Sequence, residues 1–206
     1  FKEIQMLIEI HDGLISTVRI RDYLGFMLFF PTLLSGPIDR SRRFLADQNV
    51  VMTRAEYLDL VSLGLWKFLK GALYKFVFSG LVYYFLEKVV VTGMSWKLIP
   101  YMYLYGFYLF FDFAGYSSMA IGISYILKIR TPENFNKPFI STDLIDFWTR
   151  WNITLSTWFR DYIFSRVMMF MMKHRSFKKR VTMSSVAYII NMSLMGLWHG
   201  FSTDYI

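Results

Sequence analysis

Two ionisable side chains within otherwise apolar stretches are the residues of this sequence best placed to do chemistry. His199 follows Trp198 late in an apolar run, and Asp112 is the one charged residue in the run from Leu98 to Leu127. An ionisable group in lipid is costly, so a functional role is the first hypothesis for each. An imidazole, with an unperturbed pKa near about 6.5, can take up a proton at neutral pH. His199 is therefore the candidate general base.

Both residues also have structural interpretations. A neutral imidazole can be hydrogen-bonded inside a helix bundle, and Gly196 with Gly200 forms a small-xxx-small pattern that packs membrane helices closely. Asp112 could instead pair with an arginine or cap a broken helix. The remaining histidines, His11 and His174, lie before a turn and inside a basic cluster, and neither is a good catalytic candidate.

The composition predicts that these residues lie in a membrane protein. The 206 residues are 55% hydrophobic and 20% aromatic, more than one soluble core can bury, so lipid is the expected solvent. The net charge of +8 does not indicate nucleic acid, because the basic residues lie between apolar runs and form no reading motif. Cytoplasmic loops favour Lys and Arg, which explains the excess. With no Cys and three His, neither a disulfide nor a metal centre is expected.

Two long apolar runs predict transmembrane helices, from Leu98 to Leu127 and from Met183 to Phe201. Basic clusters adjoin the end of the first run and the start of the second, which places both of these ends in the cytoplasm. We therefore expect a multi-pass protein of the cell membrane.

Other segments predict shorter or interrupted helices. Thr53 and Glu56 fit a capping box, followed by a helical pattern to about Val91 with Gly71 as a candidate bend and a membrane segment near 76–85. The stretch 23–34 is short for a span and could be re-entrant. The fold class we expect is all-α, a polytopic membrane helix bundle with interfacial and re-entrant short helices. Tryptophans mixed with charges at 141–172 indicate the interfacial ones.

Six stretches, in order along the chain, resemble the membrane-bound O-acyltransferase family. They are Leu34–Arg40, Phe110–Ser117, Pro132–Phe139, Phe147–Trp151, Leu155–Tyr162 and Met195–Gly200. Within the family the chain looks most like the branch that transfers D-alanyl groups to teichoic acids. It is less similar to the alginate O-acetyltransferases, which usually carry an acidic residue in place of Ser118 and a glycine-rich loop in place of residues 164–172. The resemblance implies that residues 1–206 are a single membrane acyltransferase domain. Because the chain starts at Phe1 without an initiator Met, we expect it to be the C-terminal part of a longer protein whose earlier spans are missing.

The resemblance also implies a reaction and its partners. The donor would be a phosphopantetheine thioester on a small carrier protein, reached from the cytoplasm, with no cofactor bound to the enzyme itself. The acceptor would be teichoic acid or a protein that relays the acyl group. His199 would be the base, and the lack of Cys favours direct attack by the acceptor over a covalent acyl-enzyme. Many relatives carry a second histidine where this chain has Asn152, and an amide can orient a substrate but cannot take up a proton at neutral pH. Asn152, Asp112 and Trp198 are accordingly predicted to position substrate.

A methionine-rich stretch beside a basic cluster is the predicted docking site for the carrier. Methionine makes adaptable apolar surfaces, and lysines would attract an acidic carrier protein. The predicted docking residues are Met168, Met169, Met172, Lys178 and Lys179. Lipid contact or core packing is the alternative for the methionines.

Two other functions stay open at this point. One is a proton-coupled transporter in which Asp112 and His199 form a relay. The absence of inverted repeats from the sequence counts against it. The other is a scaffold for membrane enzymes, in which substitution of His199 would have no effect.

Overall fold

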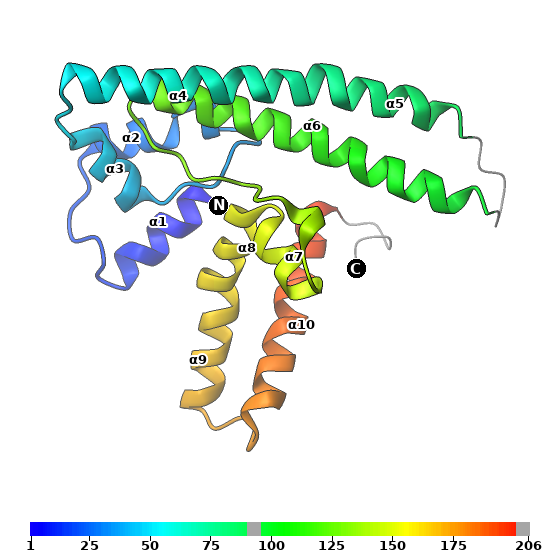
Figure 1. Ribbon diagram of the computed structural model, residues 1–206. Coiled ribbons are helices and arrows are strands. Elements are labelled where there is room, and N and C mark those ends of the chain that lie inside the picture. The colour runs from blue at the N-terminus through cyan, green and yellow to red at the C-terminus, as the bar shows by residue number, and fades with distance from the viewer. Residues whose placement is uncertain (90–95, 201–206) are drawn as a thin grey trace.

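The computed structural model describes residues 1–89 and 96–200, and within that part the regular structure is entirely helical (Figure 1). The all-α prediction is therefore confirmed for the described residues. The predicted helix ends at Val91 and Phe201 lie outside them. Two helical hairpins cross at a steep angle, and a group of short helices lies at their junction (Figure 1).

The longer hairpin pairs one interrupted helix with the most apolar one. Helix α4 (Arg54–Ala72), a π-helical segment (Leu73–Phe78) and α5 (Ser79–Glu87) follow one another without a break, and α6 (Leu98–Ile126) returns along them. The predicted capping box is confirmed, since Thr53 and Glu56 exchange both hydrogen bonds. The interruption predicted at Gly71 occurs two residues later, where the π-helical segment begins.

Glycines let the two helices of this hairpin touch through their backbones. A Cβ atom added to Gly71 would lie 2.6 Å from the carbonyl oxygen of Gly115, and one added to Gly122 would lie 2.5 Å from that of Gly64. Both distances are shorter than any ordinary contact, so a side chain at either position would push the helices apart. Gly71 therefore serves close packing, as small residues do between membrane helices.

The second hairpin carries His199. Its first arm runs through α8 (Ile153–Phe159), a π-helical segment (Arg160–Phe164) and α9 (Ser165–Lys173), and its second arm is α10 (Arg180–His199). The hairpin projects away from the rest of the molecule (Figure 1). Helix α7 (Leu144–Arg150) precedes it and lies at the junction of the two hairpins (Figure 1).

Short helices fill the side of the junction formed by the start of the chain. They are α1 (Lys2–His11), α2 (Ile20–Met27), a 3-10 turn (Phe30–Thr32) and α3 (Ser41–Asn49), and another 3-10 turn (Pro138–Ile140) precedes α7. Phe26 and Phe44, from α2 and α3, are fully buried against Met6 of α1. Stretch 23–34 is thus split between a short helix and a turn.

Two described helices, α6 and α10, are long and apolar enough to cross a membrane. They coincide with the two predicted transmembrane runs. The membrane segment expected near 76–85 falls in the π-helical segment and α5, which is not among these candidates. The polytopic bundle therefore stays a prediction.

Candidate functional site

His199 is the last residue of α10, and its ring is held from two sides. Trp198 contacts it with ring centroids 4.7 Å apart, and the Trp198 ring in turn packs against Phe1 at 5.2 Å. The Nδ1 atom of His199 lies 2.8 Å from the carbonyl oxygen of Met195. A carbonyl can only accept a hydrogen bond, so Nδ1 carries the proton. In neutral imidazole this makes Nε2 the basic nitrogen.

A groove runs beside α10, and the last residue of this helix that lines it is Met195, one turn before His199. The groove has a volume of about 460 Å³ and lies between α10 on one side and α7, α8 and the π-helical segment 160–164 on the other. Most of the surface of the groove is apolar. Met195 lines it, and the carbonyl oxygen of this residue contacts the His199 ring nitrogen. The polar residues that line the groove are Thr149, Ser156, Thr157, Arg160, Tyr188 and Asn191.

Asn191 is the polar group in this groove that lacks a partner. Its side chain is 8% exposed, and its Oδ1 atom accepts no hydrogen bond from the residues that the structure describes. Asn191, Met195 and His199 are spaced by four and so lie on the same side of α10. At about 1.5 Å per residue, Asn191 lies about 12 Å along the helix axis from His199. The groove is thus lined by a residue whose buried acceptor is unused in the described structure.

Asn152 has a backbone role that the sequence did not reveal. It lies between α7 and α8 with φ 43° and ψ 52°, in the left-handed region, and its side chain makes no capping hydrogen bond. Asparagine adopts this conformation far more readily than most residues. Substrate positioning by its amide stays a prediction, and any test of it has to preserve the turn.

A second asparagine, Asn134, links two of the stretches that resemble the acyltransferase family through Thr154, which lies just before a third. Its Oδ1 accepts hydrogen bonds from both the backbone N–H and the hydroxyl of Thr154, at 3.1 and 2.8 Å. The Thr154 hydroxyl oxygen also accepts a hydrogen bond from the N–H of Ile38 at 2.9 Å. Asn134 is 2% exposed. It lies in the Pro132–Phe139 stretch, but no local pattern marks it as a buried junction residue.

Asp112 forms an ion pair with Lys75 across the long hairpin. A basic partner was one of the expected structural roles, although the partner is a lysine and not an arginine. The helix of Asp112 packs against α4, α5 and the π-helical segment 73–78, whereas α10 packs against α9 and the π-helical segment 160–164. This arrangement gives no support to a relay between Asp112 and His199. A role of Asp112 in positioning substrate stays a prediction.

A buried polar network fixes the start of the second hairpin to the first helices. The Glu9 carboxylate, 2% exposed, accepts hydrogen bonds from the hydroxyls of Ser41 and Tyr162, at 2.6 and 2.7 Å. Burial and the bond to Glu9 raise the pKa of Tyr162 above its ordinary value. Arg40 binds Asp161 at 2.9 Å and lies over the Tyr162 ring. The π-helical segment 160–164, which forms part of one wall of the groove, is therefore fixed to α1 and to the residues at the start of α3.

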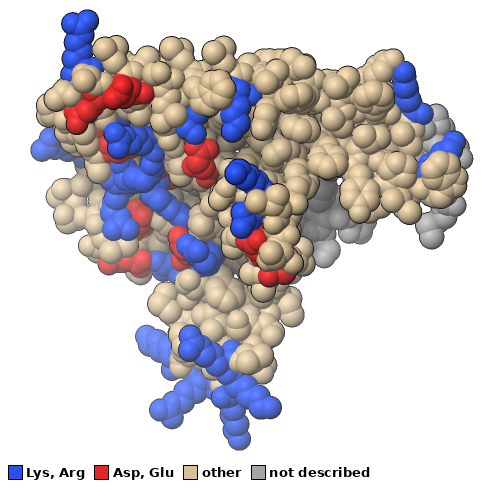
Figure 2. Space-filling view, viewed as in Figure 1, with Lys and Arg blue, Asp and Glu red and all other residues tan. Residues whose placement is uncertain are grey.

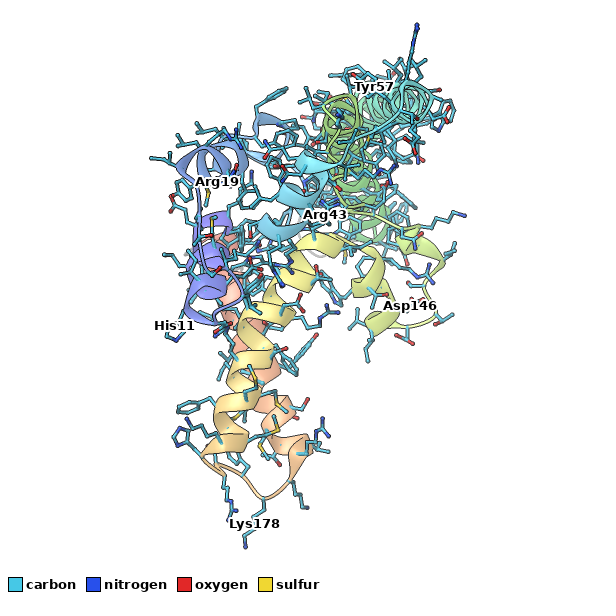
Figure 3. The ribbon with its side chains drawn as sticks, turned by 90° about the vertical axis from the view of Figure 1, so that its left-hand side faces the viewer. His11, Arg19, Arg43, Tyr57, Asp146 and Lys178 are labelled. Carbon is cyan, nitrogen blue, oxygen red and sulfur yellow. The ribbon has the colours of Figure 1, made fainter. Side chains whose placement is uncertain are left out.

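Basic side chains gather at the tip of the second hairpin, where Figure 2 shows blue without red. Lys178 points away from the body of the molecule (Figure 3), and Lys179 is also exposed. Met169 and Met172 are 55% and 47% exposed on α9. The prediction that Met168 is a docking residue is wrong for its exposure, because Met168 is 9% exposed and packs between the two arms of the hairpin.

Comparison with known proteins identifies the family. Residues 6–206 match the membrane-bound O-acyltransferase family. This chain belongs to that family. It is 45% identical over its whole length to the teichoic acid D-alanyltransferase of Bacillus subtilis (strain 168), and 43% identical to that of Streptococcus thermophilus. It is 34% identical to the probable alginate O-acetylase AlgI of Pseudomonas fluorescens.

The chain spans about half the length of the D-alanyltransferases, 53% and 51% of the two proteins, and 40% of the alginate relative. The higher identity to the D-alanyltransferases agrees with the branch indicated by Ser118 and residues 164–172. The matched region contains the groove, the basic tip and His199. The family comparison therefore concerns the part of the molecule in which the candidate site lies.

Proposed function

We propose that the protein transfers D-alanyl groups from a carrier-protein thioester toward the hydroxyls of teichoic acids, with His199 as general base. The observation that carries the proposal is the contact between His199 Nδ1 and the Met195 carbonyl. It favours the tautomer in which Nε2 accepts a proton, one helical turn beyond a groove that would hold an extended donor. The identity to two D-alanyltransferases supports the choice of acyl group.

The chemical step needs one base and no covalent enzyme intermediate. The acceptor oxygen attacks the thioester carbonyl carbon while Nε2 of His199 takes up the hydroxyl proton. The carbon–sulfur bond then breaks, and the imidazolium returns its proton to the departing sulfur, which leaves as the thiol of phosphopantetheine. The acyl group ends as an ester on the acceptor. The chain has no Cys, so a thiol nucleophile on these residues plays no part.

The donor arm would lie in the groove beside α10. Phosphopantetheine is a flexible chain with amide N–H groups, and the unpartnered Oδ1 of Asn191 suits one of them as acceptor. The apolar walls would cover its methylene and methyl groups. The pattern of a mostly apolar pocket with few polar groups is typical of small-molecule sites.

The carrier itself would dock at the hairpin tip. Exposed Met169 and Met172 offer apolar contact, and Lys178 and Lys179 offer positive charge to an acidic partner. Charges of this kind speed encounter more than they increase final affinity, and their effect falls with salt. The docking site would face the cytoplasm in a multi-pass protein of the cell membrane, and the basic residues before α10 support this orientation. The final acceptor is teichoic acid or a relay protein.

The test is mass measurement of the products formed by the full-length protein in vesicles with D-alanyl carrier protein and teichoic acid. We expect a D-alanyl ester on the acceptor and a free thiol on the carrier. An acetyl-loaded carrier is the matched control for the alginate-type reaction. Acyl transfer only from the acetyl carrier would overturn the choice of acyl group, and solute flux without any acylated product would favour a transporter.

A further inference from the structure

A second cavity, of about 210 Å³, lies on the long hairpin, away from α10. It is enclosed by α4, α6 and the loop 133–137, and two of its lining residues are the basic side chains Lys70 and Lys137. The loop returns along α6, because Phe135 contacts Phe110 with ring centroids 5.7 Å apart. The cavity is thus a pocket between two helices and a folded-back loop.

The pocket is positively charged and holds an unpartnered hydroxyl. Its one acidic lining residue, Glu133, is already paired with Lys67. Lys70 and Lys137 form no ion pair within residues 1–89 and 96–200. Ser117 is 1% exposed, and its Oγ has no hydrogen-bond partner in the described part of the chain. Two cations and a hydroxyl donor suit a phosphate group.

The pocket adjoins an uncharged part of the hairpin. Beyond the Lys75–Asp112 pair, residues 76–86 and 98–111 contain no charged side chain. The adjoining apolar surface is open, since Phe76 is 69% exposed and Phe107 38%. A ligand with a phosphate in the pocket would therefore have its apolar chains beside the exposed residues.

We propose that this pocket binds the phosphate headgroup of an anionic membrane phospholipid. Lys70 and Lys137 neutralise the headgroup, Ser117 donates a hydrogen bond to a phosphate oxygen, and the acyl chains lie along the uncharged half of the hairpin. Basic pockets between membrane helices on the cytoplasmic side bind lipid headgroups in this way. The apolar surface next to the pocket favours a lipid over a soluble phosphate.

Native mass spectrometry of the full-length protein in detergent tests the proposal. The probes are phosphatidylglycerol, phosphatidylcholine and soluble glycerol phosphate, each titrated against wild type and Lys70→Gln with Lys137→Gln. Each lysine near a membrane surface contributes on the order of fivefold in affinity, so the double variant should bind phosphatidylglycerol roughly twenty-five times more weakly. Phosphatidylcholine binding should change little.

The matched control removes two exposed charges outside the pocket, as Arg19→Gln with Lys88→Gln. It should leave phosphatidylglycerol affinity unchanged, and Ser117→Ala should weaken it severalfold. An equal loss in the control would mean general attraction between charges and would overturn the site. Equal affinity for glycerol phosphate and phosphatidylglycerol would overturn the lipid as its ligand. Because the readout is binding, it is independent of whether the protein transfers D-alanine.

Discussion

Replacement of Asn191 by leucine should have opposite effects on stability and on donor binding. A buried polar atom without a partner costs about 1–3 kcal/mol of desolvation, and Oδ1 of Asn191 is such an atom in the described structure. Leucine has a similar shape and no polar atom, so Asn191→Leu should leave the unfolding temperature unchanged or raise it. If the amide instead held the fold together, the same change would lower that temperature.

The effect on catalysis follows from the hydrogen bond that the donor would lose. A neutral hydrogen bond contributes about 0.5–1.5 kcal/mol net, which corresponds to a roughly two- to tenfold fall in kcat/KM for the thioester donor. The bond is made before and during the reaction, so the change should appear in KM, with kcat nearly unaltered. The KM for the acceptor should not move.

The assay combines thermal unfolding of the purified full-length protein with steady-state transfer from D-alanyl carrier. Met192→Leu is the matched control, because Met192 lines the same groove and the exchange conserves volume and polarity. It should leave both unfolding and donor KM close to wild type. A less stable Asn191→Leu protein with an unchanged donor KM would refute the reasoning and return Asn191 to a structural role.

Three further predictions concern the base, the turn before α8 and the carrier. His199→Ala should lower kcat by roughly 10²–10⁴ without loss of folded protein, and retention of more than about a tenth of the activity would remove the residue from the role of base. Asn152→Gly keeps the left-handed turn and loses the side-chain amide. The variant should fold as wild type and have a lower activity with the same pH dependence. Normal specific activity would leave Asn152 a purely structural residue. Met169→Asp should weaken carrier binding at every salt concentration, because it places a charge in an apolar contact. Lys178→Glu with Lys179→Glu should weaken carrier binding mainly at low salt. Unchanged carrier affinity in both the methionine and the lysine variants would place the docking site elsewhere.

Hydropathy and capping were enough to predict the long helices α4, α6 and α10. The Leu98–Leu127 run and the Thr53–Glu56 box each mark a helix through local signals, hydropathy in one case and reciprocal hydrogen bonds in the other. The short helices near the start of the chain were harder to predict. Their burial depends on contacts such as Phe26 with Phe44, from separate helices, which no local pattern contains.

The candidate site was predictable in its chemistry and not in its geometry. His199 could be chosen from its residue type, because an imidazole in an apolar run is costly. The groove could not be predicted from the sequence. Its lining residues Ser156, Arg160 and Asn191 come from separate elements and become neighbours only when the second hairpin forms. Met168 illustrates the limit: five neighbouring positions contain four methionines, and the sequence does not say which of them face the other arm.

The stretches that resemble the family now have a physical explanation that goes beyond catalysis. Asn134 and Ile38 come from two of them and form one hydrogen-bonded junction through Thr154, while Arg40 and Asp161 join two of them by an ion pair. None of these five residues lines the groove itself. Both sets of contacts instead fix α8 and the π-helical segment after it, which form one wall of the groove, against the rest of the fold. A base on the last turn of α10 is useful only if the opposite wall holds the thioester at a constant position. These residues would then serve catalysis through the rigidity of that wall.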